Sequence, residues 1–382
     1  MNITKLKKLS YDEVVKCNKC GFCLPSCPVY LVEKKESASP RGRNAITRAV
    51  IEGRLDMSHD TERAIFSCLG CGACKQVCLS SVETKDLIFR DRECQVGEGL
   101  YPKIADRVVA FLKEEHNITD DDNEERGEWQ DLIKDLPERA FEKARAEVIF
   151  FVGCVASFFP MAQNIPVNMS RIMLSAGVDF SILGGEEWCC GFPLIGAGMP
   201  NEMGELKEHN MEKVEEVGAK TVVFTCPSCY HTWKHLYELN DVNLYHSSQF
   251  IDQLIKDGRL KLKKKNAVTV TYHDPCDLGR NTGVFDEPRN VLRAIPGLTL
   301  VELPLNRQLS MCCGGGGNVE MVNPELSAAI AQMKIDEIRS TGADMVVSAC
   351  QQCLRTIATR ARKQKIDLAV KDLTELVAEA ME

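Results

Sequence analysis

The spacing of apolar residues changes part-way along the chain. Before about residue 146 they recur at helical intervals, as Ile46 and Val50 do within the segment 39–56, and such spacing is typical of amphipathic helices. The segment 104–116 has the same pattern. The alternating pattern of a strand does not stand out in this part of the sequence. We therefore predict a mostly helical N-terminal region.

From residue 147 onward, short apolar runs alternate with helix-like stretches. The strand-like runs occupy residues 147–154, 178–183 and 220–229, and again 268–276, 298–303 and 343–353. Helical stretches lie between them, for example at 202–217. Strands that alternate with helices at this spacing indicate α/β units with largely parallel sheets. The predicted fold class is α/β with an all-α N-terminal part.

The α/β part contains an internal repeat. Matching cysteines are separated by 122, 123 and 124 positions: Cys154 and Cys276, Cys189 and Cys312, Cys226 and Cys350. Self-similarity at one nearly fixed period indicates a duplicated unit. We therefore predict two copies of one α/β domain.

The domain boundaries follow from these patterns. We predict a helical domain at 1–115, an acidic linker or helix at 116–146, and the repeated domains at 147–265 and 266–382. The linker holds the run TDDDNEER at 119–126, and a charge run of this kind usually lies on a solvated surface. We expect this segment to be exposed.

Composition and charge narrow the classes of function. The net charge of −8 argues against nucleic acid as a partner, because phosphate binding needs a basic surface. No apolar core of a secretory signal follows Met1, and the longest apolar-leaning run, 148–162, is shorter than the ~20 residues of a membrane span. We expect a cytoplasmic protein that associates with a membrane only through a partner subunit.

The cysteine content is the exceptional feature of this composition. The chain has 19 cysteines. In a long chain without a secretory signal, so many cysteines indicate metal binding rather than a disulfide framework. An odd number fits this interpretation, because a set of metal ligands need not be even.

Two stretches near the N-terminus, CNKCGFCLPSCP and CLGCGACKQVCL, carry the spacing C-x2-C-x2-C-x3-C. In two-cluster ferredoxins with this pattern, three cysteines bind one 4Fe–4S cube and the fourth binds the other cluster. The predicted ligands are Cys17, Cys20, Cys23 and Cys78 for the first cubane cluster, and Cys68, Cys71, Cys74 and Cys27 for the second. Two zinc sites of four thiolates each are the alternative. The second copy departs from the pattern at one position. Leu79 follows its fourth cysteine, whereas Pro28 follows the fourth cysteine of the first copy.

Each α/β repeat offers five further cysteines. The sets are Cys154, Cys189, Cys190, Cys226 and Cys229 in the first, and Cys276, Cys312, Cys313, Cys350 and Cys353 in the second. One cysteine follows a strand, a vicinal pair lies in a glycine-rich loop and a CxxC follows another strand, so all five are expected to meet at one end of a sheet. They exceed what one zinc ion or one cube needs. They suit a cluster with a more open iron arrangement, in which one thiolate can bridge.

This doubled pattern resembles the CCG, or cysteine-rich, domain pair of heterodisulfide reductase, and the chain from Cys17 to Cys353 is similar to the D subunit of that enzyme. All ten cysteines of the CCG pattern are present. The resemblance implies that each CCG domain binds a noncubane 4Fe–4S cluster and that the two clusters cleave a disulfide reductively. It thus implies four 4Fe–4S clusters, two cubane and two noncubane.

The resemblance also implies a place in a multi-subunit oxidoreductase of an anaerobe. Electrons would come from a flavoprotein or cytochrome subunit, because the sequence has no nucleotide or flavin motif and Gly314–Gly317 is not followed by G-K-[ST]. Related subunits serve glycerol-3-phosphate, glycolate and lactate dehydrogenases and benzoyl-CoA reductase complexes. A pure electron relay without a substrate is therefore the alternative function, and a zinc-stabilised interaction protein is a third.

A few further residues could contribute to chemistry. His231, His246 and His273 lie near the CCG cysteines in sequence and could donate a proton to a leaving thiolate, although a structural role is the more common one. Cys94 falls outside every set, and we expect a plain buried thiol. No catalytic residue is predicted beyond the cluster ligands.

Overall fold

The computed structural model describes residues 1–134, 136–137, 139–263 and 267–381. Its N-terminal part is helical, as the apolar spacing predicted. The helices are α1 (Ile3–Val14), α2 (Pro28–Glu33), η1 (Glu36–Ala38), α3 (Pro40–Ile51), α4 (His59–Phe66), α5 (Ala73–Gln76), α6 (Thr84–Gly97) and α7 (Ile104–Glu114). Local signals set where they begin. Ser39 caps α3 by accepting a hydrogen bond from the Gly42 amide, and Pro40 occupies its first position.

Two four-stranded sheets follow, and every strand pair in them is parallel. The strands are β1 (Val148–Phe151), β2 (Phe180–Ser181), β3 (Thr221–Phe224) and β4 (Asn243–His246), then β5 (Val268–His273), β6 (Leu298–Glu302), β7 (Met345–Ser348) and β8 (Ala369–Asp372). Their orders are β2-β1-β3-β4 and β6-β5-β7-β8. The identical order confirms the predicted fold class and the duplication. The edge strands β4 and β8 were not predicted, because they lack a continuous apolar run.

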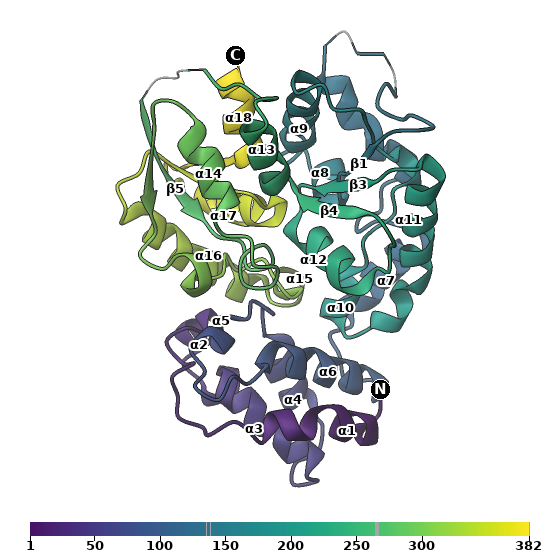
Figure 1. Ribbon diagram of the computed structural model, residues 1–382. Helices are drawn as coiled ribbons and strands as arrows, with labels where there is room; N and C mark the ends of the chain where they lie inside the picture. Colours follow the sequence, from purple (N-terminus) through teal and green to yellow (C-terminus); the bar gives the residue numbers. More distant parts are fainter. Residues whose placement is uncertain (135, 138, 264–266, 382) are drawn as a thin grey trace.

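Helices surround both sheets (Figure 1). They are α8 (Cys154–Phe158), α9 (Asn164–Ser175), η3 (Gly184–Glu186), α10 (Phe192–Ala197), η4 (Pro200–Met203), α11 (Gly204–Val217), α12 (Pro227–Leu236) and α13 (Ser247–Lys256), then α14 (Glu287–Ala294), η5 (Arg307–Leu309), α15 (Val319–Val322), α16 (Pro324–Arg339), α17 (Gln351–Lys363) and α18 (Leu373–Met381). None of the helices in the described part of the chain combines the length and the apolar character that a membrane crossing requires.

The two repeats exchange their last helices. The helix α13 that ends the first repeat packs on α14 of the second, and α18 at the end of the second repeat packs on α9 of the first. Ile172 of α9 and Leu376 of α18 consequently belong to one buried cluster. The repeats therefore share a core. The predicted boundary between 265 and 266 lies outside the described residues, and the other boundaries remain predictions.

The segment after α7 is packed against the first repeat, and the expectation that it is exposed is wrong for much of its length. It forms a 3-10 helix, η2 (Asn123–Leu132), in which Asn123, Arg126 and Trp129 are buried. Trp129 lies in the same cluster as the strand residue Phe150. The charge run misled because two of its polar residues, Asn123 and Arg126, find buried hydrogen-bond partners in the repeat.

A buried arginine joins the helical part to both repeats. Arg92, on α6, donates hydrogen bonds to the carbonyl oxygens of Gly196 in the first repeat at 2.6 Å and of Gly317 in the second at 3.0 Å. It also donates to the carbonyl of Cys68 at 2.5 Å and to those of Ile65 and Phe66. Figure 1 shows α1 to α6 lying beneath the two α/β lobes, with α6 facing them, whereas α7 lies beside the first repeat. This side chain therefore fixes three parts of the molecule at one point.

We predict that Arg92→Met destabilises the protein by about 3 kcal/mol or more, because several buried carbonyls lose a charged donor. The thermal midpoint of the anaerobically prepared protein measures this as a fall of several degrees. Arg90, on the same helix, makes one exposed hydrogen bond to the Leu9 carbonyl at 2.7 Å, and Arg90→Met is expected to cost less than about 1 kcal/mol. Equal shifts in the two variants would contradict the role of Arg92.

Candidate metal centres

The eight cysteines of the N-terminal motifs lie around two small cavities. Each cavity has a volume of about 20 Å³. The first is lined by Cys17, Cys20, Cys23 and Cys78, with Cys74 also at its wall. The second is lined by Cys27, Cys68, Cys71 and Cys74. Each cavity thus receives three cysteines of one motif and the last cysteine of the other.

The thiols around these cavities outnumber the positively charged side chains beside them. Burial and repulsion from Cys71 and Cys68 raise the pKa of Cys74 well above its ordinary value. Burial likewise raises the pKa of Cys23 to about 11. A bound metal group reverses this situation, since a coordinated thiol gives up its proton. Arg43, buried on α3, is 4.0 Å from Cys27 Sγ and supplies part of the missing charge.

The cysteines of the two repeats meet at one larger cavity of about 410 Å³. They follow the carboxyl ends of equivalent strands, where parallel sheets place their sites. Its lining includes Cys154, Cys189, Cys190, Cys226 and Cys229 of the first repeat and Cys276, Cys313, Cys350 and Cys353 of the second. The structure therefore faces the two CCG sets toward each other across a shared space.

Cys312 is the one CCG cysteine outside this lining, although its thiol contacts those of Cys276 and Cys313, which belong to it. It packs with Cys71 of the helical part in one buried cluster. Contact with Cys312 lowers the pKa of Cys71 to about 6. The neighbouring Cys313 contacts Cys353 and lines the cavity. The thiol of Cys312 therefore lies between Cys71 of the helical part and Cys276 and Cys313 of its own set.

The run of four glycines in this loop serves close packing. A Cβ atom on Gly316 would lie 2.7 Å from the Leu69 carbonyl oxygen, and one on Gly317 would lie 2.6 Å from that of Cys68. Gly317 also has φ +58, which side chains rarely adopt. The glycines thus let the loop of the second CCG set touch the loop of the second N-terminal motif.

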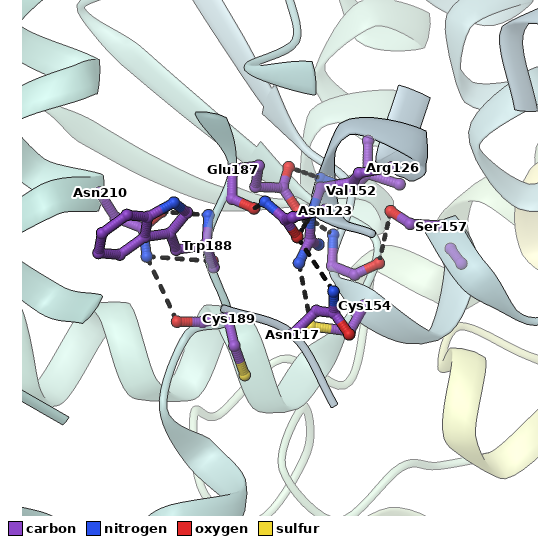
Figure 2. Close-up of polar contacts among 12 residues, drawn as sticks. Asn117, Asn123, Arg126, Val152, Cys154, Ser157, Glu187, Trp188, Cys189 and Asn210 are labelled. Carbon is purple, nitrogen blue, oxygen red and sulfur yellow. Dashed lines mark hydrogen bonds and ion pairs between the residues drawn. The ribbon is translucent and has the colours of Figure 1, made fainter. Parts of the chain in front are cut away.

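A buried ion pair supports the first CCG set (Figure 2). Arg126 is paired with Glu187 at 3.0 Å, and both side chains are only 1% exposed. Arg126 also donates to Cys154 Sγ at 3.5 Å. Glu187 accepts hydrogen bonds from the Val152 and Gly153 amides at 2.7 and 2.8 Å. Arg126 was not identified from the sequence, because it lies in an acidic run, far from the cysteines along the chain.

Two further polar groups face the shared cavity, and neither was identified from the sequence. Asp277, next to Cys276, accepts hydrogen bonds from Ser228 Oγ and from Asn281 Nδ2, both at 2.7 Å. On the other side Glu320 accepts hydrogen bonds from Arg355 and Gln352. In the sequence, the only signal for these two residues was their position close to cysteine motifs. The remaining wall is largely apolar and includes Val108, Ile118, Val155 and Phe192.

The three candidate histidines do not belong to the described lining of the shared cavity. Burial lowers the pKa of His231 to about 4 and that of His246 to about 3, so both are neutral at pH 7. His246 caps α13 by accepting from the Ser248 amide at 3.2 Å. His273 lies against Cys313 and Cys353. Cys94 is buried with Leu6 and Leu87 in the core of the helical part.

Family models match most of the cysteine-bearing sequence. One described as "4Fe-4S dicluster domain" matches residues 13–82, and one described as "Cysteine-rich domain" matches 148–234 and 270–358. These ranges hold every cysteine except Cys94. Domains that bind 4Fe–4S clusters are therefore present, and the abundant cysteines fit iron–sulfur binding.

Several named proteins are similar over nearly the whole chain. The D subunit of the dihydromethanophenazine:CoB--CoM heterodisulfide reductase of Methanosarcina mazei is 32% identical over 100% of this chain and 96% of its own. The B subunit of the fumarate reductase (CoM/CoB) of Methanothermobacter marburgensis is 29% identical over 98% of this chain and 74% of its own. The EtfAB:quinone oxidoreductase of Syntrophomonas wolfei is 26% identical over 96% and 58%. All three are oxidoreductases or parts of them.

We predict that Arg126→Met lowers the free energy of unfolding by about 3–5 kcal/mol, because it leaves the Glu187 carboxylate buried without its positively charged partner. Burial already raises the pKa of Glu187. The double variant Arg126→Met/Glu187→Gln should recover part of the loss, since no buried charge remains. Thermal midpoints of the four proteins form a double-mutant cycle. Additive losses would show that the pair does not interact.

The neutral state of His246 predicts a loss of stability in acid. Its folded pKa of about 3 lies below the ordinary value of 6.5, so the unfolded chain binds the proton first as the pH falls. The contribution is present above pH 6.5, and about 2 kcal/mol should be lost between pH 7 and pH 5. His246→Asn keeps a capping side chain and should reduce this loss in denaturation curves at the two pH values. An unchanged pH dependence would contradict the assignment.

Proposed function

The chain belongs to the family of heterodisulfide reductase D subunits, and on that premise we propose that it reduces a disulfide with electrons that pass through two cubane and two noncubane 4Fe–4S clusters. It is an iron–sulfur electron-transfer subunit of a heterodisulfide-reductase-like or related oxidoreductase. The substrate and the number and type of clusters are the parts of this function that we propose.

The proposed ligand sets follow the cysteine motifs, and the two small cavities group the N-terminal cysteines in the same way. Cys17, Cys20, Cys23 and Cys78 would hold one cubane cluster, and Cys27, Cys68, Cys71 and Cys74 the other. Cys154, Cys189, Cys190, Cys226 and Cys229 would hold one noncubane cluster, and Cys276, Cys312, Cys313, Cys350 and Cys353 the second. Soft thiolates are the ligands that iron–sulfur groups require. The crowding of buried thiols supports this assignment over free cysteines.

The observation that carries the proposal is the single cavity between the two CCG sets. A disulfide has two sulfur atoms, and its reduction consumes two electrons and two protons to give two thiols. When bound, the two iron–sulfur groups supply the electrons at opposite walls of the cavity. The volume of about 410 Å³ lies within the range of small-molecule sites. The two iron–sulfur groups would take up part of this volume, because nine of their ten proposed ligands line it, and a disulfide would occupy the remainder.

The other residues of the cavity have complementary roles. Asp277, held by Ser228 and Asn281, places a carboxyl group at the cavity wall that would pass a proton from solvent to a departing thiolate. The apolar wall formed by Val155 and Phe192 would bind hydrocarbon and exclude water. Neutral, buried His231 and His246 are poorly suited to proton delivery, and we assign them no such role.

Electrons would enter at the outer edge of the helical part. Cys20 is the exposed cysteine of the chain, and Leu79 and Phe22 nearby are 80% and 58% exposed. The sequence departure at Leu79 thus places an apolar side chain at the surface next to Cys78. We propose that electrons arrive here from a flavoprotein or cytochrome subunit. The partner's identity is part of the proposal.

We expect about sixteen irons and as many acid-labile sulfides per chain after anaerobic purification, because four 4Fe–4S clusters require them. Reduced viologen and the CoB–CoM heterodisulfide, the substrate named for the Methanosarcina relative, should then yield two thiols per disulfide. The electron paramagnetic resonance spectrum should change when the disulfide is added. About eight irons that resist reconstitution would instead indicate a two-cubane relay.

The matched variant for this experiment is Asp277→Asn. It keeps the size of the side chain and removes the acid, so thiol release should fall by about a hundredfold while the iron content stays at the wild-type level. Full iron content without thiol release from any disulfide tested would favour the relay function. The names of the fumarate reductase and quinone oxidoreductase relatives are the support for that alternative.

A further inference from the structure

Arg280 lies where the second CCG set meets the N-terminal cysteines. It follows Cys276 in the loop after β5, and its Nε donates to the carbonyl oxygen of Cys71 at 2.7 Å. Its Nη1 donates to the carbonyls of Ser310 and of Gln308. One side chain therefore ties the loop that carries Cys71 to the loop that leads into Cys312.

The third nitrogen of this guanidinium has a different environment. Nη2 is buried and has no hydrogen-bond partner within the described residues. Buried N–H groups in proteins are nearly always satisfied, so an acceptor on a group bound between the cysteines would be its natural partner. The ionisable groups that interact with Arg280 are the thiols of Cys71, Cys276 and Cys312 and the carboxyl group of Asp277. The free N–H thus belongs to the space between the two groups of cysteines.

The two repeats differ at this position. Four residues after the first cysteine stand Phe158 in the first repeat and Arg280 in the second. The first repeat has its own buried arginine, Arg126, but this one comes from η2 and contacts Cys154. The duplication therefore carries one arginine per CCG set, and only Arg280 also bonds to the helical part among the described contacts of the two.

We propose that Arg280 is a positioning residue for electron transfer between the second cubane cluster and the second CCG cluster. This inference rests on the proposed function, because it requires clusters at both cysteine sets. The guanidinium holds Cys71 against Cys312, and its positive charge stabilises the added electron on the clusters it separates. In the step one electron leaves the reduced cubane and one arrives at the CCG cluster, with no bond made or broken. The electron originates from the electron-donating partner, or from dithionite in the test.

Two variants separate the position of the side chain from its charge. Arg280→Met removes both, so the midpoint potential of the second cubane should fall and electron arrival at the CCG clusters should slow at least tenfold. Arg280→Lys keeps the charge but cannot bridge both loops, so the potential should stay near the wild-type value while the rate still falls. For a one-electron step, a shift of about 59 mV in the midpoint potential changes the ratio of reduced to oxidised cluster tenfold.

The measurements are an anaerobic redox titration followed by electron paramagnetic resonance, and freeze-quench spectra after mixing with dithionite. Arg307→Met is the control, because Arg307 lies in the same repeat, pairs with Asp286 at 2.7 Å and is not among the residues that contact Cys71 or Cys312. It removes the same formal charge and should leave potential and rate unchanged. Arg280→Met behaving like Arg307→Met, or Arg280→Lys restoring the rate, would overturn the proposal.

Iron content separates this result from a failure of the proposed function. With about sixteen irons in the wild type and in the variants, an unchanged rate speaks against Arg280 alone. With about eight irons in the wild type, the CCG clusters are absent and the proposed function fails. If Arg280→Met does not fold, Arg280→Lys still tests the proposal. A slower electron transfer at an unchanged midpoint potential supports it, and an unchanged rate contradicts it.

Discussion

The structure depends on the close contact between the glycine-rich loop of the second repeat and the second cysteine motif of the helical part. Gly316 and Gly317 come so near to the backbone of Cys68 and Leu69 that no side chain fits between them. Arg92 locks this contact by donating to carbonyls on both sides. Any cluster held by the helical part is therefore placed next to the second CCG set, and the distance is fixed by backbone rather than by mobile side chains.

The duplication gives two similar sites with different surroundings. Both sheets have the same strand order, so equivalent cysteines reach the shared cavity from opposite sides. In the first repeat Glu187 and Arg126 bind the loop before Cys154. In the second, the equivalent loop is held by Asp274, which pairs with buried Arg289. The charged side chains around the two sets of thiols therefore come from different elements, which allows two iron–sulfur groups of one type to have different potentials.

The exchange of the last helices explains why these sites can stay in register. Because α13 and α18 each pack on the other repeat, the two sheets cannot shift relative to each other without opening a common core. A cavity lined by both repeats requires this rigidity, since a site displaced by about 1 Å loses much of its function. The structure thus resembles one domain with internal symmetry more than two linked domains.

The sequence by itself determined the helical and α/β parts, the duplication and the identity of the candidate ligand cysteines, because cysteine spacing and apolar periodicity are local properties. It did not identify Arg126, Arg92 or Arg280, and it misjudged the segment around η2. These side chains act on cysteines or carbonyls far away in sequence, so only the tertiary structure decides whether a charge is solvated or buried. The same holds for the contact between Cys312 and Cys71 and for the single cavity between the repeats, which arise from packing three parts of the chain around one junction.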